Sequence, residues 1–197
     1  MLVSDLDGVV RLFDPTLWDE LDQLLGRPTG STIRAFLGNP IIGDVITGRA
    51  SHAEWRAAIG TRLQDDGASA KQAEEAIDRW LLAAGRLDPK LLELVNVAES
   101  RGIACFLFTN GTDRVRDELD ALGFREFVPL GRERIINSAE LGVAKPDPES
   151  FTRAHAGIEA ALARHVEPPR VLFLDDRADN VAAARSFGWG SCLVPGV

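Results

Sequence analysis

The spacing of hydrophobic residues along the chain changes twice. The first residues form a short apolar run that predicts a buried strand. From about residue 15 to 84, apolar residues recur at helical spacing, and no segment there has the pattern of a strand. From Asp88 onward, helical segments alternate with apolar runs of strand length. This alternation is typical of an α/β fold with a doubly wound parallel sheet, here with a helical block inserted after its first strand.

Local signals mark the beginnings of several predicted elements. Ser51 followed by Glu54 has the pattern of a capping box, and Asp88 before Pro89 is typical of a helix start. Later strands are predicted at residues 103–108, near Phe127, and at 135–136, 171–174 and 192–194. Within the helical block three tryptophans lie among aliphatic residues at helical spacing, which favours core packing over sugar stacking; they are Trp18, Trp55 and Trp80.

Composition narrows the classes of partner. The 197 residues carry a formal net charge of -8, which argues against nucleic acid and anionic membranes as partners. No apolar run reaches the ~18 residues of a membrane span, and no basic stretch precedes an apolar one at the N-terminus, so we expect a cytoplasmic protein. Cys105 and Cys192 lie in apolar runs without metal-ligand spacing, which predicts two buried thiols and no disulfide.

Polar side chains follow the predicted strands. Asp5 and Asp7 alternate to the same side of the first strand, and two like charges so close favour a divalent cation bound by oxygen. Other polar residues follow two later strands or precede a helix between them; these are Thr109, Asn110, Lys145, Asp175 and Asp176. Ligands of such sheets bind at the carboxyl ends of the strands, so we expect these groups to converge on magnesium and phosphate oxygens.

Four ordered motifs resemble those of the haloacid dehalogenase-like hydrolase superfamily. They are Asp5-Leu6-Asp7-Gly8-Val9, Thr109-Asn110-Gly111, Lys145-Pro146-Asp147-Pro148 and Asp175-Asp176. The resemblance spans nearly the whole chain. It implies a Rossmann-like core formed by residues 1–14 and 85–197, with a helical cap at residues 15–84. It also implies magnesium-dependent phosphoryl transfer through an aspartyl-phosphate.

The resemblance also implies roles for the four acids. Asp5 resembles the nucleophile, and its second carboxylate oxygen would bind Mg²⁺. Asp7 resembles the general acid and base, with its backbone carbonyl on the metal. Asp176 resembles the direct metal carboxylate, and Asp175 a second or water-mediated ligand. The dehalogenases that name the family lack an acid at the position of Asp7, which favours phosphate chemistry over carbon–halogen cleavage.

The remaining motif residues resemble the phosphate-binding groups. Thr109 and the backbone beside Asn110 would hold the phosphoryl group. Lys145 would offset negative charge between the nucleophile and the phosphate. A carboxylate that attacks while a cation and a lysine neutralise charge fits phosphoryl transfer.

We therefore expect a magnesium-dependent phosphatase acting on a small phosphorylated metabolite, a sugar phosphate being one candidate. A phosphomutase shares every core residue and stays open as an alternative. A phospho-receiver domain also combines acids, a threonine and a lysine, but in another order and without so large a helical insertion. A non-catalytic binding protein on the same fold does not need the complete set of motifs. Monomer and homodimer both fit the sequence.

Several residues carry weaker signals. Asn180 fits either a role in the metal loop or a helix cap. Arg11 lies after the first strand, where a solvated side chain is a simpler interpretation than substrate contact. The three histidines, His52, His155 and His165, have no paired ligand spacing, and no chemistry is assigned to them.

Overall fold

The strands of the computed structural model, which describes residues 1–124 and 131–195, form two sheets. They are β1 (Leu2–Ser4), β2 (Arg11–Leu12), β3 (Arg86–Leu87), β4 (Cys105–Thr109), β5 (Ile135–Asn137), β6 (Leu172–Asp175) and β7 (Gly190–Leu193). The larger sheet is parallel and has the order β5-β4-β1-β6-β7, whereas β2 and β3 form a separate antiparallel pair. The α/β prediction is confirmed, with β1 at the centre.

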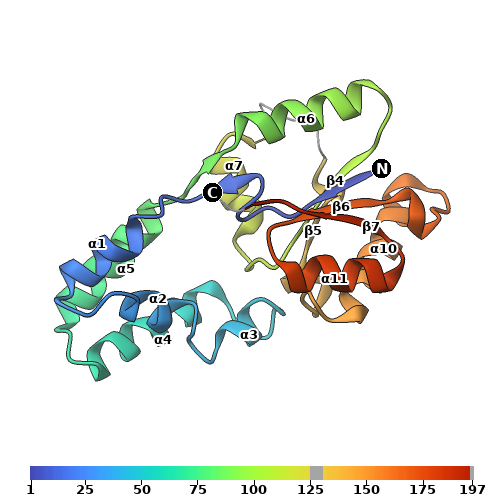
Figure 1. Cartoon of the computed structure of the whole chain (residues 1–197). Helices are drawn as coiled ribbons and strands as arrows, with labels where there is room; N and C mark the ends of the chain where they lie inside the picture. The colour runs from blue at the N-terminus through green and yellow to red at the C-terminus, as the bar shows by residue number, and fades with distance from the viewer. Residues whose placement is uncertain (125–130, 196–197) are drawn as a thin grey trace.

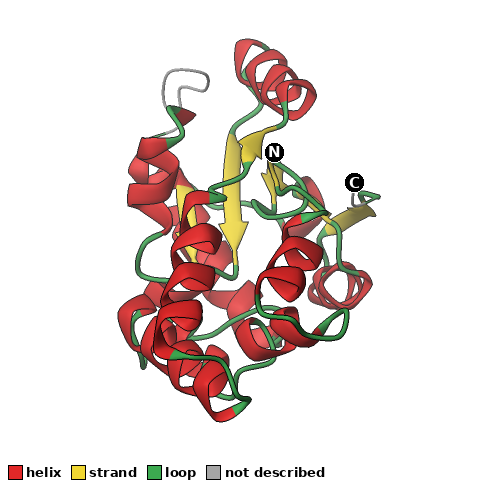
Figure 2. Ribbon diagram, turned by 90° about the vertical axis from the view of Figure 1, so that its left-hand side faces the viewer, coloured by secondary structure: helices red, strands yellow, loops and turns green. Residues whose placement is uncertain are grey.

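The described helices lie in two groups (Figure 1), and Figure 2 shows helices on both sides of the strands. Between β2 and β3 are α1 (Leu17–Leu24), α2 (Ser31–Phe36), α3 (Ile42–Val45), α4 (His52–Asp65) and α5 (Ala70–Leu82). Among the strands of the parallel sheet are α6 (Pro89–Ser100), α7 (Val115–Ala121), α9 (Ser138–Leu141), α10 (Pro148–Leu162) and α11 (Ala178–Phe187), with short 3₁₀ turns at Arg132–Arg134 and Pro168–Arg170. Figure 1 shows α1 to α5 gathered to one side of the sheet.

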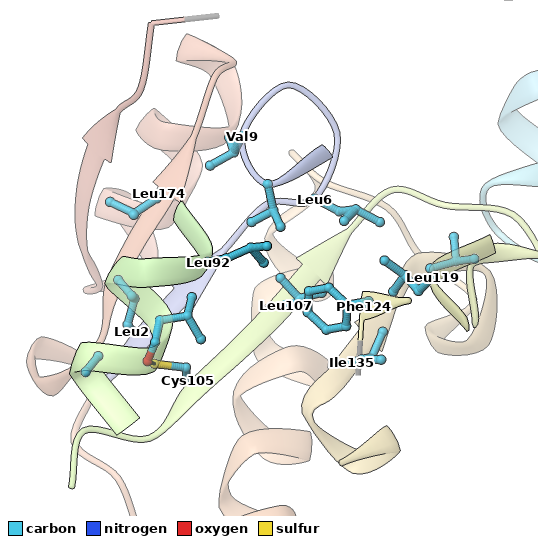
Figure 3. Packing of buried hydrophobic residues seen from close by; sticks show 14 residues of the cluster. Leu2, Leu6, Val9, Leu92, Cys105, Leu107, Leu119, Phe124, Ile135 and Leu174 are labelled. Atoms are coloured by element: carbon cyan, nitrogen blue, oxygen red, sulfur yellow. Dashed lines mark hydrogen bonds between the residues drawn. The ribbon is translucent and has the colours of Figure 1, made fainter. Parts of the chain in front are cut away.

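Alternate residues of the strands pack under different helices, as the period of a strand requires. On one face Leu2 and Leu107 join residues of α6 and α7 in a single apolar cluster (Figure 3). On the other face Val3 and Phe106 join residues of α10 and α11. Both faces of the sheet are therefore covered, which explains why its strands appear in the sequence as continuous apolar runs.

The helices α1 to α5 have a core of their own. Leu21, Ile59 and Leu63 are fully buried in it, and the three tryptophans of this segment pack there as the sequence predicts. Phe36 and Trp80 meet edge to face at 5.2 Å between ring centroids. The capping box at the start of α4 is present, and α5 begins with a second one.

The helical segment touches the rest of the molecule through its middle as well as at β2 and β3. The Ser138 hydroxyl donates to the carbonyl of Ile46 at 2.5 Å, and the His52 backbone N–H donates to the Asp113 carboxylate at 2.8 Å. Between these contacts lies Gly48, whose φ is 72°. A Cβ at this position would lie 2.2 Å from the backbone carbonyl oxygen of Ala139, so glycine allows the two backbones to approach closely.

Two features differ from the sequence predictions. The pairing of β2 with β3 was not predicted, because two-residue strands leave no periodic pattern. The prediction of a buried Cys192 is wrong: the residue is exposed, since β7 is an edge strand with little cover. Cys105 is buried as predicted, and burial together with Glu99 raises the pKa of its thiol to about 12. The strand predicted near Phe127 lies outside the described residues.

Within residues 1–124 and 131–195, the helices are all too short or too polar to cross a bilayer.

The buried carboxylate of Asp22 provides a test of how the helical segment is held together. It accepts hydrogen bonds from the backbone N–H groups of Gly30 and Thr32 and from the Thr32 hydroxyl, at 2.6–2.8 Å. Asp22→Asn replaces one acceptor oxygen by a donor. Because hydrogen bonds to charged groups are worth about 1.5–3 kcal/mol, we expect the free energy of unfolding to fall by about 2 kcal/mol.

Urea unfolding followed by tryptophan fluorescence measures this loss, with Asp65→Asn as the control. Asp65 is exposed at the end of α4, so its substitution should change stability by less than about 0.5 kcal/mol. Equal stabilities of the two variants would contradict the role given to Asp22.

Candidate active site at the carboxyl ends of β1, β4 and β6

A buried ammonium group lies at the centre of the predicted site. The side chain of Lys145 has no solvent exposure, and its Nζ lies 3.1 Å from Asp5 Oδ1 and 2.7 Å from Asp175 Oδ2. Its third hydrogen bond goes to the carbonyl of Phe108 at 2.8 Å. All three protons of the ammonium therefore have acceptors, and these come from the ends of β1, β4 and β6.

Asp5 directly follows β1 and is buried. Its Oδ1 accepts from the backbone N–H of Leu6 at 2.7 Å as well as facing Lys145. Among the described residues no hydrogen bond goes to Oδ2, which leaves that oxygen available. Burial raises the pKa of Asp5 to about 7; Lys145 opposes this effect, while the charges of Asp175 and Asp7 add to it. A cation beside Asp5 would favour its ionised form.

Asp175 is held from three sides. Lys145 binds one oxygen, the backbone N–H of Arg177 donates to the other at 2.9 Å, and the Asn180 amide donates to both at 3.0 and 3.1 Å. Asn180 therefore does not cap a helix but supports the loop after β6, which decides between its two interpretations. Its own Oδ1 is buried and has no hydrogen-bond partner among the described residues.

A third carboxylate completes an acidic cluster. Ligand atoms of Asp5, Asp175 and Asp176 lie within 4.8 Å of one another. Asp176 is half-buried, and burial, followed by the charge of Asp175, raises its pKa. The carboxylate of Asp176 also lies against Gly8, where a Cβ would be 2.3 Å from its Oδ2. With a φ of 84°, Gly8 is required both for the turn after β1 and for this close approach.

Thr109 and Asn110 lie at the end of β4, the strand next to β1. Thr109 is the last residue of β4, is buried, and lies next to the end of β1 in the sheet. The Asn110 side chain donates to the backbone carbonyl of Lys145 at 2.7 Å and accepts from the backbone N–H of Lys145 at 2.8 Å. Asn110 therefore ties the backbone of Lys145 to β4, a role that the sequence did not indicate. Phosphate binding by the neighbouring backbone stays a prediction.

The carboxylate of Asp7 points toward an arginine and is not a member of the acidic cluster. Arg11 Nε donates to Asp7 Oδ1 at 2.6 Å, and Nη2 donates to Oδ2 at 3.0 Å. The interpretation of Arg11 as a solvated side chain is wrong, since the residue is 6% exposed. Burial lowers the pKa of Arg11, but the charges and hydrogen bonds of Asp7 and Glu118 outweigh this and raise it above its usual value. Sequence reasoning missed Glu118, which lies far along the chain without a motif.

Other candidate features lie elsewhere. A cavity of about 790 Å³ is lined by residues of β3 and α6 and by Leu122 after α7, and it includes none of the three clustered aspartates. His155 bonds to Val166 and Trp189 in the core, and His165 contacts Glu159 and Glu167 at the surface. His52 stacks on Trp80. None of the three histidines belongs to the acidic cluster.

Comparison with known proteins finds relatives over nearly the whole chain. A curated relative, bifunctional epoxide hydrolase 2 of Sus scrofa, is 25% identical over 209 residues, which cover 98% of this chain. The chain spans only 36% of the length of that relative.

Solved structures share the fold at low sequence identity. A HAD family enzyme from Bacteroides thetaiotaomicron has a TM-score of 0.71 and 19% identity, covering 99% of this chain and 93% of that one. A predicted HAD-like hydrolase from Porphyromonas gingivalis has a TM-score of 0.68 and 19% identity, covering 99% and 90%. A structure described as a dehalogenase has a TM-score of 0.67 and 17% identity, covering 98% and 84%.

The family assignment comes from the sequence itself. The model of the haloacid dehalogenase-like hydrolase family matches residues 1–188, which include all four motifs and the helical segment. The match covers nearly the whole chain, and the motif residues meet at one edge of the sheet. The chain therefore belongs to the haloacid dehalogenase-like hydrolases.

Proposed function

We propose that the chain is a magnesium-dependent phosphatase that hydrolyses a small phosphorylated metabolite through a phosphorylated Asp5. The observation that carries this proposal is the charge balance around Lys145. When all three clustered carboxylates are ionised they face one buried ammonium, which leaves an excess of two negative charges in a mostly buried place. Buried charges need partners, and one divalent cation would supply the balance.

The donor set fits magnesium. The cluster offers carboxylate oxygens and no sulfur or imidazole, which suits a hard cation. Asp5 and the half-buried Asp176 would hold it, with the backbone carbonyl of Asp7, whereas Asp175 is occupied by Lys145 and Asn180. The cation would neutralise charge on the phosphoryl oxygens during transfer. A second structure of the Bacteroides thetaiotaomicron enzyme, 20% identical to this chain, is a complex with magnesium and inorganic phosphate.

The side chains of the site then have distinct tasks in two steps. In the first, Asp5 attacks phosphorus, a bond to its carboxylate oxygen forms, and the bond to the leaving oxygen breaks as Asp7 gives that oxygen a proton. In the second, Asp7 takes a proton from water, the water oxygen bonds to phosphorus, and Asp5 is released. Lys145 offsets negative charge throughout, and Thr109 holds the phosphoryl group.

Carbon–halogen cleavage is the main competing activity, because several similar structures are described as dehalogenases. That reaction has no leaving oxygen to protonate. Asp7 at the second position of the first motif, with a side chain 38% exposed, offers an acid for such an oxygen. Phosphate esters are therefore the better match to this chain.

The helical segment gives the proposed enzyme its selectivity. It leaves the core between β2 and β3, and residues 15–84 would act as a cap over the site. Its contact with the core through Gly48, Ile46 and His52 places it against Ala139, Ser138 and Asp113. A cap of this kind encloses small substrates and excludes bulk water.

The first test of this function is dependence on magnesium and on Asp5. Release of phosphate from a panel of phosphorylated metabolites should require magnesium and stop in chelator. Asp5→Asn should lower kcat by several powers of ten, because an amide is not an anionic nucleophile. The remote Asp65→Asn should match the wild type. Full turnover in chelator would refute the metal, and full turnover of Asp5→Asn would refute the nucleophile.

A second test concerns the charge of Lys145. Lys145→Met keeps most of the length of the side chain but removes the ammonium. Because charge-assisted hydrogen bonds are worth about 1.5–3 kcal/mol, inhibition by vanadate should weaken by about 10- to 100-fold, and kcat should fall. Lys90→Met, at an exposed lysine, is the control. An unchanged inhibition constant in folded Lys145→Met would contradict the role of Lys145 in offsetting negative charge at the phosphoryl group.

A third test addresses the cap through Gly48. Gly48→Ala would force the helical segment away from Ala139, so the preference for sugar phosphates over a phosphoserine peptide should decrease. Gly67→Ala is the matched control, because its φ of 97° gives similar backbone strain but a Cβ there meets nothing within 4 Å. The ratio of kcat/KM values measures the preference. Equal ratios in the two variants would contradict selection by the cap.

A further inference from the structure

Arg11 is a buried arginine whose guanidinium binds two carboxylates. Nε and Nη2 hold the two oxygens of Asp7 at 2.6 and 3.0 Å, and Nη1 donates to Glu118 Oε2 at 2.7 Å. Each of its three nitrogens therefore already has a partner. Two of its five N–H groups have no hydrogen-bond partner among the described residues, but the side chain is only 7% exposed, so the main route from Arg11 to a substrate runs through Asp7.

The backbone and the packing hold Arg11 in place. It lies in β2, where it pairs with Leu87 of β3, and its guanidinium carbon lies 5.1 Å from the centre of the Phe13 ring. A Cβ on Gly85 would lie 3.1 Å from Arg11 Cγ. The backbone that follows α5 therefore packs directly against the aliphatic part of the Arg11 side chain. The orientation of the guanidinium is therefore fixed independently of Asp7.

A fixed guanidinium determines the orientation of the carboxylate that it binds. Two parallel N–H···O bonds define the plane of the Asp7 carboxylate, which a single bond would not do. The Asp7 side chain remains 38% exposed, whereas that of Arg11 is 7% exposed. Each carboxylate oxygen has lone pairs left for a second partner on its open side. The pair thus presents Asp7 outward in one defined orientation.

We propose that Arg11 is a positioning residue for proton transfer: it holds the Asp7 carboxylate in the orientation from which Asp7 meets the leaving oxygen, and Glu118 holds Arg11. This inference rests on the proposed phosphatase function and adds a residue pair outside the four motifs. It also links proton transfer to β2 and β3, the two strands through which the chain enters and leaves the helical segment.

The dependence of rate on the leaving group tests this role, because proton donation matters for poor leaving groups and little for good ones. Arg11→Gln should lower kcat/KM for an alkyl phosphate by about tenfold or more, part of the 10²–10⁴ that general acid–base catalysis supplies. For p-nitrophenyl phosphate the loss should stay below about threefold. Arg11→Lys, which keeps the charge without the two parallel bonds, should fall between the wild type and Arg11→Gln.

Two controls separate positioning from loss of stability. Arg27→Gln removes another largely buried arginine, one that bonds to the Leu63 carbonyl and Asp66 within the helical segment, and should leave the leaving-group dependence unchanged. In the Asp7→Asn background, Arg11→Gln should cause little further loss, because both changes act through one group. Equal losses for both phosphates, additive losses in the double variant, or a gain in rate would each overturn the proposal.

A crystal structure of Arg11→Gln gives a test that needs no turnover. The Asp7 carboxylate should leave its wild-type orientation or occupy more than one, whereas Asp5 and Lys145 should stay in place. An Asp7 side chain that is unchanged in this variant overturns the positioning role even if the enzyme is active. Absence of phosphatase activity in the wild type, by contrast, would refute the proposed function and leave this structural result to decide whether Arg11 orients Asp7.

Discussion

The buried ammonium of Lys145 is the interaction on which the site depends. Its three acceptors come from separate parts of the chain: Asp5 after β1, Phe108 in β4 and Asp175 at the end of β6. Without the ammonium, two carboxylates would face each other in a place closed to water, which costs several kcal/mol per unpaired charge. The same ammonium therefore holds the ends of the three strands together and balances the charge of the site.

The surrounding polar groups serve mainly to hold this arrangement. Asn110 binds the backbone of Lys145 on both sides, and Asn180 binds both oxygens of Asp175. These contacts fix the backbone of Lys145 and the carboxylate of Asp175, so neither group has to move when a substrate binds. Groups that are already in position need no reorganisation during the reaction, which is the advantage of a preorganised polar site.

The sequence was sufficient for the fold and for the residues at the strand ends, because each strand of a covered parallel sheet appears as an apolar run followed by polar residues. It could not indicate that Glu118 would bind Arg11, since 107 positions separate them and neither lies in a motif. The exposure of Cys192 was equally hidden, because a run of apolar residues does not reveal whether its strand lies at an edge. Contacts between distant segments are decided by tertiary packing alone.

The difference in solvent exposure between the two cysteines allows the motion of the helical segment to be measured. The Cys105 thiol is buried under α6 and resists ionisation, whereas the Cys192 thiol is exposed on the outermost strand. A maleimide dye should therefore attach at a single place on the sheet without any engineered residue. Three of the four tryptophans lie in the helical segment, so energy transfer to such a dye would report the separation between that segment and the sheet in solution.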